Sequence, residues 1–293
     1  MTLQPLQLAS NPLHVLSQGR ISSVDPRGTP LETFIRYHAQ EPSMSTPSVW
    51  GVAGSPVDHS VTPILFDLVG RSLGITSNST ITIDTENIDD VISFIQSQDG
   101  DVWISCTSPL KHSLHQKFPL KSRGSSSLNQ IARIGGSMAV RDTDGAGFLE
   151  ACWGLGITPS DHSLMIRGGG STARSISLAW TRKGGYIVPV EGRRPLPDGP
   201  WSTNVLIQER ADVGIDLDAD PGRRKATKMP TEVKLSVSYD VNWNADDFAI
   251  RMLAAQHLDA WRYLFAPNLS DQLPTVENLL IALKKMRGTD DQS

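Results

Sequence analysis

The 293-residue sequence is poor in cysteine, with only Cys106 and Cys152. Two thiols cannot build a disulfide framework, and no paired Cys/His spacing indicates a structural zinc site. The sequence also lacks an apolar run approaching the ~18 residues that span a bilayer. Its N-terminus lacks the basic start and apolar block of a signal peptide. We therefore expect no metal, no membrane association and a reducing compartment, with the cytoplasm as the default.

An excess of basic residues is missing as well. The sequence contains 27 Lys and Arg against 31 Asp and Glu, a net charge of −4. General nucleic-acid binding needs clustered Lys and Arg to neutralise phosphates. The cluster Arg223-Arg224-Lys225 lies in a polar stretch and is interpreted as a solvated loop. We expect a small-molecule partner and no nucleic acid, with the chain acting as a monomer or homodimer.

The composition that remains is that of a globular protein, 39% hydrophobic and 20% charged. The length suits one large domain or two ordinary ones. Residues 1–47 are rich in Pro, Ser, Gln and Gly, and no apolar periodicity persists there. This segment is predicted to be a flexible N-terminal extension.

From Trp50 onward, short β-rich segments alternate with amphipathic helical ones, which indicates βαβ units and a parallel sheet. A first unit has strands at 49–53, 80–84 and 101–106 and helices at 63–73 and 88–96; a second has strands 163–167 and 186–190 around helix 172–183; helices 246–265 and 275–286 follow. We expect an α/β protein of two domains with the site in the cleft between them. The substrate domain spans 48–145, completed by helices within 246–288, and a Rossmann-like dinucleotide-binding domain spans 146–245.

Three glycines, Gly168, Gly169 and Gly170, stand between the strand and the helix of the second unit, followed by Ser171 and Thr172. Glycines let the backbone turn tightly and approach a pyrophosphate, which then faces the amides and the positive dipole end of the helix. A triple glycine alone is weak evidence. The strand before it and the helix after it favour a dinucleotide-binding turn.

The next strand ends in Glu191-Gly192-Arg193-Arg194. An acidic side chain at this position accepts a hydrogen bond from the adenosine ribose of NAD, whereas arginine favours the 2′-phosphate of NADP. Two adjacent arginines outweigh one glutamate, so Arg193 and Arg194 favour NADP. NAD binding through Glu191, or a plain charged surface turn, are the alternatives.

Polar groups elsewhere suit an anionic, hydroxylated ligand. Ser60 and Thr62 precede a helix, where hydroxyls and free amides suit a carboxylate, although an ordinary N-cap is the alternative. Lys111 follows a strand at the carboxyl edge of the expected sheet, where α/β proteins bind ligands. Asn129 and Asp144, taken singly, are a turn residue and a helix cap.

Taken in order, these blocks resemble the shikimate dehydrogenase family. Its members carry a Gly-x-Pro-x-x-His-Ser-x-Ser-Pro loop, Asn-Val-Thr-x-Pro-x-Lys, Ala-Val-Asn-Thr and Asn-Thr-Asp-Gly segments, and a Gly-Ala-Gly-Gly-Ala-Ala-Arg nucleotide turn. The matching residues here are 54–63, 105–111, 127–130, 142–145 and 168–174. The resemblance covers about 48–190 well and the rest poorly.

The resemblance implies reversible, NADPH-dependent reduction of 3-dehydroshikimate to shikimate, a step towards chorismate and the aromatic amino acids. It implies a catalytic proton-transfer pair of Lys111 and Asp144, a carboxylate held by Ser60 and Thr62, and ring hydroxyls contacted by Thr107 and Asn129. The chemistry agrees, because oxidising a secondary alcohol needs hydride loss to the nicotinamide and proton loss to a base. A lysine beside a carboxylate can move that proton.

Several positions depart from the family pattern. Thr62 replaces the second loop serine, as in members that oxidise quinate, and Ser105 replaces the asparagine of the lysine segment. The family's Asn-Ala-Thr-x-x-Gly-Met stretch is expected near 207–214 and is not found there. Trp243 stands where a tyrosine is expected, and Ala266-Pro267 lies where a glutamine of the next-to-last helix is expected.

These departures leave two alternatives open. The nearer one is a quinate or quinate/shikimate dehydrogenase that uses NAD through Glu191. The other is a non-catalytic relative that senses the ligand, which the divergent region 207–267 favours. Retention of Lys111 and Asp144 argues against a sensor, since a sensor has no need of a proton-transfer pair.

Overall fold

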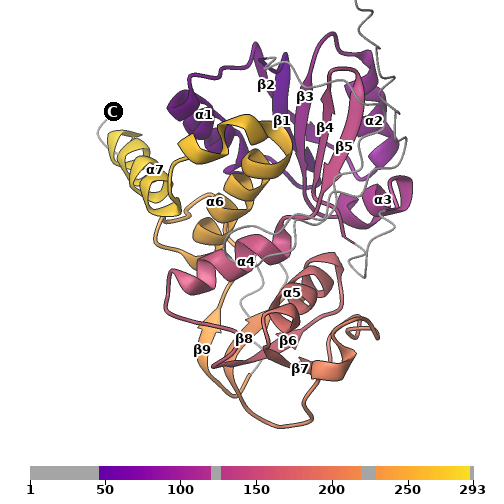
Figure 1. Ribbon diagram of the computed structural model, residues 1–293, viewed down its shortest axis with the longest axis vertical. Coiled ribbons are helices and arrows are strands. Elements are labelled where there is room, and N and C mark those ends of the chain that lie inside the picture. Colours follow the sequence, from indigo (N-terminus) through magenta and orange to yellow (C-terminus); the bar gives the residue numbers. More distant parts are fainter. Residues whose placement is uncertain (1–45, 120–126, 219–228, 291–293) are drawn as a thin grey trace, which may run out of the picture.

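The computed structural model describes residues 46–119, 127–218 and 229–290, and it shows an α/β protein built on two sheets (Figure 1). The expected α/β class is confirmed. Residues 1–45 of the expected extension and the basic cluster 223–225 lie outside the described residues. None of the helices within the described ranges is long and apolar enough to cross a bilayer.

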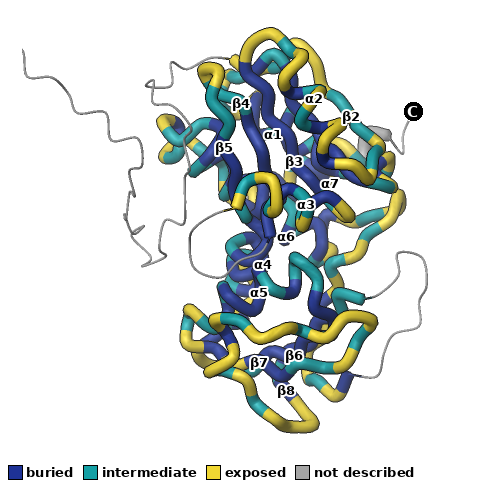
Figure 2. Tube along the Cα trace, turned by 90° about the vertical axis from the view of Figure 1, so that its right-hand side faces the viewer, coloured by how far each residue is buried: buried dark blue, intermediate teal, exposed yellow. Residues whose placement is uncertain are grey.

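The first sheet has the strand order β2-β1-β3-β4-β5. Its strands are β1 (Val49–Gly54), β2 (Ser79–Asp84), β3 (Val102–Cys106), β4 (Gln130–Ile134) and β5 (Ser137–Arg141), and its helices are α1 (Thr62–Leu73), α2 (Ile88–Ser97) and α3 (Leu110–Lys117). β1 pairs in parallel with β2 and β3. β1 and β3 are buried along their whole length, because apolar clusters cover both faces of the sheet (Figure 2).

The expected parallel pairing is confirmed for β1, β2 and β3, while β4 and β5 are two further strands that the sequence analysis did not identify. β4 pairs antiparallel with both β3 and β5, so the sheet is mixed. The turn Gly135-Gly136 joins β4 to β5, with φ of 55° and 78°. Two residues with positive φ form the tight turn that matches the twist of hairpin strands, and glycine adopts it without strain. This Gly-Gly dipeptide is the hairpin signal in the sequence.

The second sheet has the order β7-β6-β8-β9, and every pair is parallel. Its elements are β6 (Ser163–Arg167), α5 (Ser171–Arg182), β7 (Tyr186–Val190), a 3-10 helix (Ser202–Asn204), β8 (Ala211–Asp216) and β9 (Thr231–Leu235). The predicted bounds of β6 and β7 are confirmed. The glycine turn joins the carboxyl end of β6 to α5, which is where open parallel sheets bind ligands.

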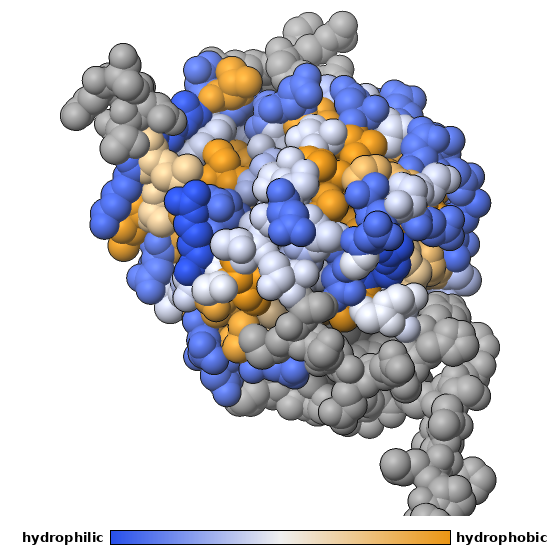
Figure 3. All heavy atoms as spheres, turned by 90° about the horizontal axis from the view of Figure 1, so that it is seen from above, coloured by the Kyte–Doolittle hydropathy of each residue, from blue (hydrophilic) through white to orange (hydrophobic). Residues whose placement is uncertain are grey.

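The last helices of the chain return to the first sheet (Figure 1). They are α6 (Phe248–Ala260), a π-helical turn (Trp261–Phe265), a 3-10 helix (Pro267–Gln272) and α7 (Val276–Asp290). Trp261 and Phe265 enter an aromatic core with Trp50, Phe66 and Trp103, in which Trp103 and Phe265 stack with ring centroids 5.2 Å apart. Seen from above, the described surface of this unit carries hydrophobic side chains scattered among hydrophilic ones (Figure 3).

Helix α4 (Asp144–Trp153) lies between the two units and packs against both α5 and α6. Two glycines allow this close approach. A Cβ on Gly145 would lie 2.5 Å from the carbonyl oxygen of Ser175 on α5, and one on Gly147 would lie 2.3 Å from Cγ of Gln256 on α6. The first residue of α4, Asp144, is thereby held where elements of both units converge.

Candidate active site

The two expected catalytic side chains, Lys111 and Asp144, form an ion pair. Nζ of Lys111 lies 2.9 Å from Oδ1 and 2.7 Å from Oδ2 of Asp144. Lys111 is on the first turn of α3, past the carboxyl end of β3, and Asp144 opens α4. The Asp144 side chain is fully buried and that of Lys111 is 17% exposed. The ammonium is therefore the member of the pair that keeps access to solvent.

The Asp144 carboxylate accepts hydrogen bonds from three further side chains. Oδ1 accepts from Nδ2 of Asn129 and Nε2 of Gln256, each at 3.1 Å, and Oδ2 accepts from the hydroxyl of Thr172 at 2.9 Å. A buried carboxylate needs such donors because water is excluded. Together they fix the orientation of the carboxylate towards Lys111.

Asn129 is itself held in place. Its Oδ1 accepts a hydrogen bond of 2.8 Å from the backbone N–H of Thr143, the residue before Asp144. This contact sets the amide so that its NH₂ group points at the carboxylate. The structure thus brings Lys111, Asn129 and Asp144, which are far apart in the sequence, into one hydrogen-bonded group.

Gln256 is a site residue that the sequence interpretation missed. It lies on α6, 112 positions after Asp144. The expectation that a glutamine is missing, because Ala266-Pro267 occupies its place, is therefore wrong. The available signal was the adjacent pair Gln256 and His257, two polar residues that stand among mostly apolar neighbours and are buried on α6.

The expected carboxylate ligands share the start of α1. Oγ of Ser60 accepts from the backbone N–H of Thr62 at 3.3 Å, and Oγ1 of Thr62 lies 3.3 Å from Nε2 of His257. Thr107, at the neighbouring strand end, donates its backbone N–H to the carbonyl of Ala53. All three hydroxyl-bearing residues therefore lie at the carboxyl edge of β1 and β3.

His257 orients the hydroxyl of Thr62. The imidazole is 1% exposed, and its Nδ1 has no hydrogen-bond partner among the described residues. A buried N–H without an acceptor is rarer and costlier than a free lone pair. We therefore assign the proton to Nε2, which donates to Thr62 and leaves the Thr62 hydroxyl proton for another acceptor, such as a carboxylate. Burial lowers the pKa of His257 to about 3, so the ring is neutral at pH 7.

Tyr239 is the tyrosine of the site. Its ring packs edge-on against His59, with centroids 5.7 Å apart, and its hydroxyl hydrogen-bonds with Ser60. Burial raises the pKa of this phenol above its usual value, which keeps it protonated. Trp243, to which the sequence interpretation gave the tyrosine's place, instead lies 4.3 Å from the guanidinium of Arg287.

The glycine turn has the backbone that a phosphate-binding loop requires. Gly168 has φ of 104°, a conformation that side chains disfavour. A Cβ on Gly169 would lie 1.9 Å from the carbonyl oxygen of Pro195, which explains why this chain has glycine where the family motif has alanine. At the N-cap, Gly170 leaves the first amides of α5 without a side-chain acceptor.

The turn after β7 places its two arginines at the surface. The Arg193 side chain is 69% exposed, and its Nε lies 4.0 Å from Oδ1 of Asp218, whose side chain is 7% exposed. Asp218 also accepts a hydrogen bond from the backbone N–H of Arg193. Asp218 was not identified from the sequence. Asp218 follows the end of β8 and brings this segment of the chain to the glycine turn.

These features fit a dinucleotide. Among the residues that the structure describes, and apart from its chain neighbours, no atom lies within 4 Å of the position that a Cβ on Gly170 would take, so these residues leave the start of α5 open to a ligand. A helix start with free amides is an anion site. Arg193 and Arg194 are exposed beside it and can meet a further phosphate, whereas the nearby carboxylate of Asp218 opposes one.

The cysteines take no part in this chemistry. Cys106 and Cys152 are free and buried, and burial raises the pKa of each thiol to about 12. A thiol that does not ionise is a poor nucleophile.

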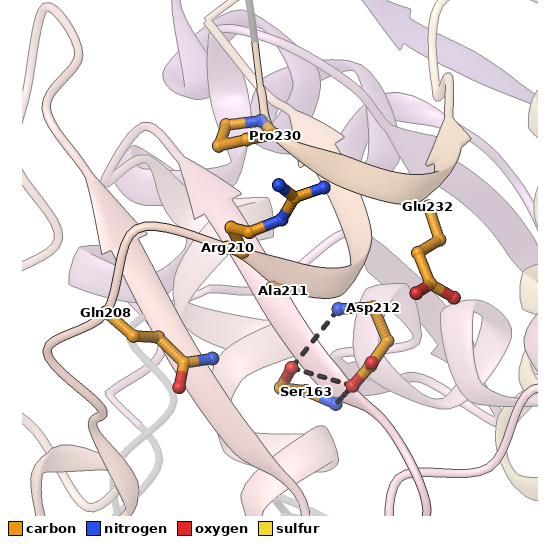
Figure 4. A pocket seen from close by; sticks show the side chains of 7 residues that line it. All are labelled: Ser163, Gln208, Arg210, Ala211, Asp212, Pro230 and Glu232. Atoms are coloured by element: carbon orange, nitrogen blue, oxygen red, sulfur yellow. Dashed lines mark hydrogen bonds between the residues drawn. The ribbon is translucent and has the colours of Figure 1, made fainter.

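A separate cavity of about 130 Å³ lies at the amino ends of β6 and β8 (Figure 4). It is lined by Gln208, Arg210 and Glu232 among others. Asp212 accepts the backbone N–H of Ser163 at 2.6 Å and its hydroxyl at 2.8 Å, and these bonds lower the pKa of the carboxyl group. Ligands of parallel sheets bind at the opposite, carboxyl edge. We therefore interpret Asp212 as a structural link between two strands.

The sequence is similar to curated shikimate dehydrogenases (NADP(+)), although no family model matches it. It is 27% identical to that of Rubrobacter xylanophilus over 153 residues, 50% of this chain and 54% of that protein. It is 26% identical to that of Xanthomonas euvesicatoria pv. vesicatoria over 182 residues, 60% of this chain and 59% of that protein. The chain spans about half the length of the curated relatives it matches.

Solved structures share the fold. Shikimate 5-dehydrogenase from Thermus thermophilus, in complex with NADP(H) and shikimate, aligns with a TM-score of 0.62 and 20% identity over 81% of this chain and 98% of that chain. Shikimate dehydrogenase 1 from Peptoclostridium difficile aligns with a TM-score of 0.61 and 15% identity over 81% and 98%. The family resemblance indicated by the motifs is supported by these relatives.

The low pKa of His257 predicts acid sensitivity. Unfolded His257 takes up a proton below its ordinary pKa of 6.5, while the folded protein excludes that proton down to about pH 3. The free energy of unfolding therefore falls as the pH drops from 6.5 towards 3. Between pH 6.5 and 4.5 the loss is up to about 2–3 kcal/mol.

Urea unfolding at a series of pH values measures this loss. His257→Gln keeps a donor for Thr62 but has no titrating group, so its stability should fall less over the same interval. Parallel pH dependences for the two proteins would contradict a neutral, buried His257.

Proposed function

We propose that this chain is a shikimate dehydrogenase, which catalyses the reversible NADPH-dependent reduction of 3-dehydroshikimate to shikimate. The observation that carries the proposal is the Lys111–Asp144 ion pair, with Asn129 and Gln256 on the same carboxylate. This centre lies between a carboxylate-binding helix start and a nucleotide turn. The curated relatives, named for this activity, support the proposal.

Each group has a task in this reaction. The nicotinamide, when bound, supplies or accepts the hydride. Nζ of Lys111 gives a proton to the substrate oxygen on reduction and removes it on oxidation. Asp144 pairs with the ammonium and holds Nζ in place. Ser60 and Thr62 hold the substrate carboxylate, and Thr107, Asn129 and Gln256 accept or donate at the ring hydroxyls.

The arrangement argues against a sensor that only binds. Binding needs donors and acceptors, which Ser60, Thr62 and Asn129 already offer. A desolvated lysine–aspartate pair is costly to keep buried and adds most where a proton must move.

We assign residues 48–145 with helices from 246–288 as the substrate domain and 146–245 as the NADP-binding domain. Two free thiols fit a reducing compartment, the cytoplasm.

Initial-rate assays test the proposal directly. The wild-type protein is incubated with shikimate or quinate, each with NADP⁺ or NAD⁺, and reduced cofactor is followed by its absorbance. We expect the highest kcat/KM with shikimate and NADP⁺. Faster turnover of quinate would move the assignment to a quinate dehydrogenase, and shikimate binding without turnover in any combination would favour a sensor.

Removing the proton-transfer groups should abolish most turnover. Lys111→Ala and Asp144→Asn are expected to lower kcat for shikimate by about 10²- to 10⁴-fold, the usual range for acid–base catalysis. The control is Lys117→Ala on the same helix, whose ammonium pairs at the surface with Asp89. Its kcat should match that of the wild type. Near-normal kcat in either site variant would overturn the assignment.

Cofactor choice should depend on the arginine turn. If Arg193 and Arg194 contact a 2′-phosphate, replacing both with Ala raises the KM for NADPH at least tenfold, since charge-assisted hydrogen bonds contribute about 1.5–3 kcal/mol. The KM for NADH should stay nearly unchanged, which makes NADH the internal control. An equal rise in the KM for both cofactors would mean that the turn does not contact the 2′-phosphate.

A further inference from the structure

Thr172 belongs to the nucleotide turn by sequence, but its hydroxyl points at the catalytic pair. Its Oγ1 accepts from Nζ of Lys111 at 3.1 Å and donates to Oδ2 of Asp144 at 2.9 Å. With the 2.7 Å contact between Lys111 and Asp144, the three side chains close a ring of hydrogen bonds. From its place in the sequence, Thr172 is predicted only to bind the cofactor.

The ring joins two parts of the protein. Lys111 comes from α3 beside the first sheet, whereas Thr172 lies on the first turn of α5, two residues after the last glycine of the nucleotide turn. Threonine is branched at Cβ, so its χ1 angle is stiff and its hydroxyl follows the backbone closely. The position of the turn therefore sets the position of an acceptor for Lys111.

An ordinary helix cap does not account for this side chain. Capping hydroxyls belong to the N-cap residue, but the N-cap of α5 is Gly170, and Thr172 is the second residue of the helix. The family motif has alanine where Thr172 stands, so a nucleotide turn by itself requires no hydroxyl here. The Thr172 hydroxyl therefore gives the Lys111–Asp144 pair a contact that nucleotide binding by the turn does not require.

The contact with Thr172 engages the third N–H of the Lys111 ammonium. Lysine has three N–H donors, and among the described residues the two carboxylate oxygens and Thr172 take all three. Hydrogen bonds to the carboxylate are charge-assisted and stronger than the bond to a neutral hydroxyl. The proton that Lys111 shares with Thr172 is therefore the one it releases most easily to a substrate oxygen.

We propose that Thr172 is a positioning residue, which ties the Lys111–Asp144 pair to the nucleotide turn and aims the transferable proton of Lys111. This inference rests on the proposed dehydrogenase function. A positioning role predicts an effect on kcat, because the hydroxyl acts through Lys111. It predicts little effect on KM for either shikimate or NADP⁺.

Four variants test the hydroxyl. Thr172→Val removes it at nearly constant shape, Thr172→Ala restores the family residue, and Thr172→Ser keeps the hydroxyl. The matched control is Thr181→Val on the same helix, where the hydroxyl donates to backbone carbonyls of its own helix, that of Ser177 at 2.8 Å and that of Leu178 at 3.4 Å. We expect Thr172→Val and Thr172→Ala to lower kcat at least about tenfold, since the lost hydroxyl hydrogen-bonds with two charged groups. Thr172→Ser and the control should stay within about threefold of the wild type.

A second readout does not depend on turnover. In protein labelled with ¹⁵N-lysine, the ammonium signal of Lys111, identified by its absence in Lys111→Ala, reports on protection of its protons from water. The signal should be visible in the wild type, Thr172→Ser and Thr181→Val, and broadened in Thr172→Val and Thr172→Ala. The dissociation constant for NADP⁺, measured by calorimetry without substrate, should change less than twofold in all variants.

Three results would overturn the inference. An unchanged kcat in Thr172→Val means that the pair needs no help from the turn. A raised dissociation constant for NADP⁺ at unchanged kcat places Thr172 in nucleotide binding alone. Failure of Thr172→Ser to restore kcat shows that the methyl group matters and not the hydroxyl. If the wild type does not oxidise shikimate, the proposed function fails, and the Lys111 signal alone decides whether the contact exists.

Discussion

The ion pair between Lys111 and Asp144 is the interaction on which the rest of this structure depends. Its carboxylate is fully buried, and burial of a charge is favourable only when hydrogen bonds replace the lost water. Those bonds come from α6 and α5 through Gln256 and Thr172, and from Asn129 just before β4. The elements of both units must therefore pack closely enough to reach one carboxylate.

Helix α4 makes this packing possible. Gly145 and Gly147 let its first turns approach α5 and α6 to distances that any side chain would prevent. The backbone N–H of Gly145 also donates a hydrogen bond of 2.8 Å to the hydroxyl oxygen of Ser175, which fixes α4 to α5 beside the site. The helix that carries the Asp144 carboxylate is thus the element that joins the two units.

The two sides of the site differ in character. On the substrate side, Thr62 and His257 are almost fully buried and Tyr239 lies over Ser60, so the donors are held before any ligand arrives. On the nucleotide side, Arg193 and Arg194 are exposed and the nearest carboxylate is that of Asp218. A buried, preorganised set of donors favours selectivity for one substrate. At the exposed turn, by contrast, affinity for the proposed cofactor depends on charged side chains in solvent, and salt screens their interaction with a phosphate.

Local pattern in the sequence determined much of this protein. Apolar periodicity located β1, β2, β3, β6 and β7 and five of the helices, because two- and 3.6-residue repeats are properties of neighbouring residues. It did not identify β4, β5, β8, β9, α3 or α4. The order of short motifs likewise located Lys111, Asn129 and Asp144, since each motif is a contiguous loop at a strand end. Only tertiary structure decided which distant side chains complete the site. Gln256, Tyr239, Asp218 and the second contact of Thr172 depend on packing between residues far apart in the sequence, 112 positions in the case of Gln256 and Asp144. No local periodicity encodes which of several polar side chains faces a buried carboxylate.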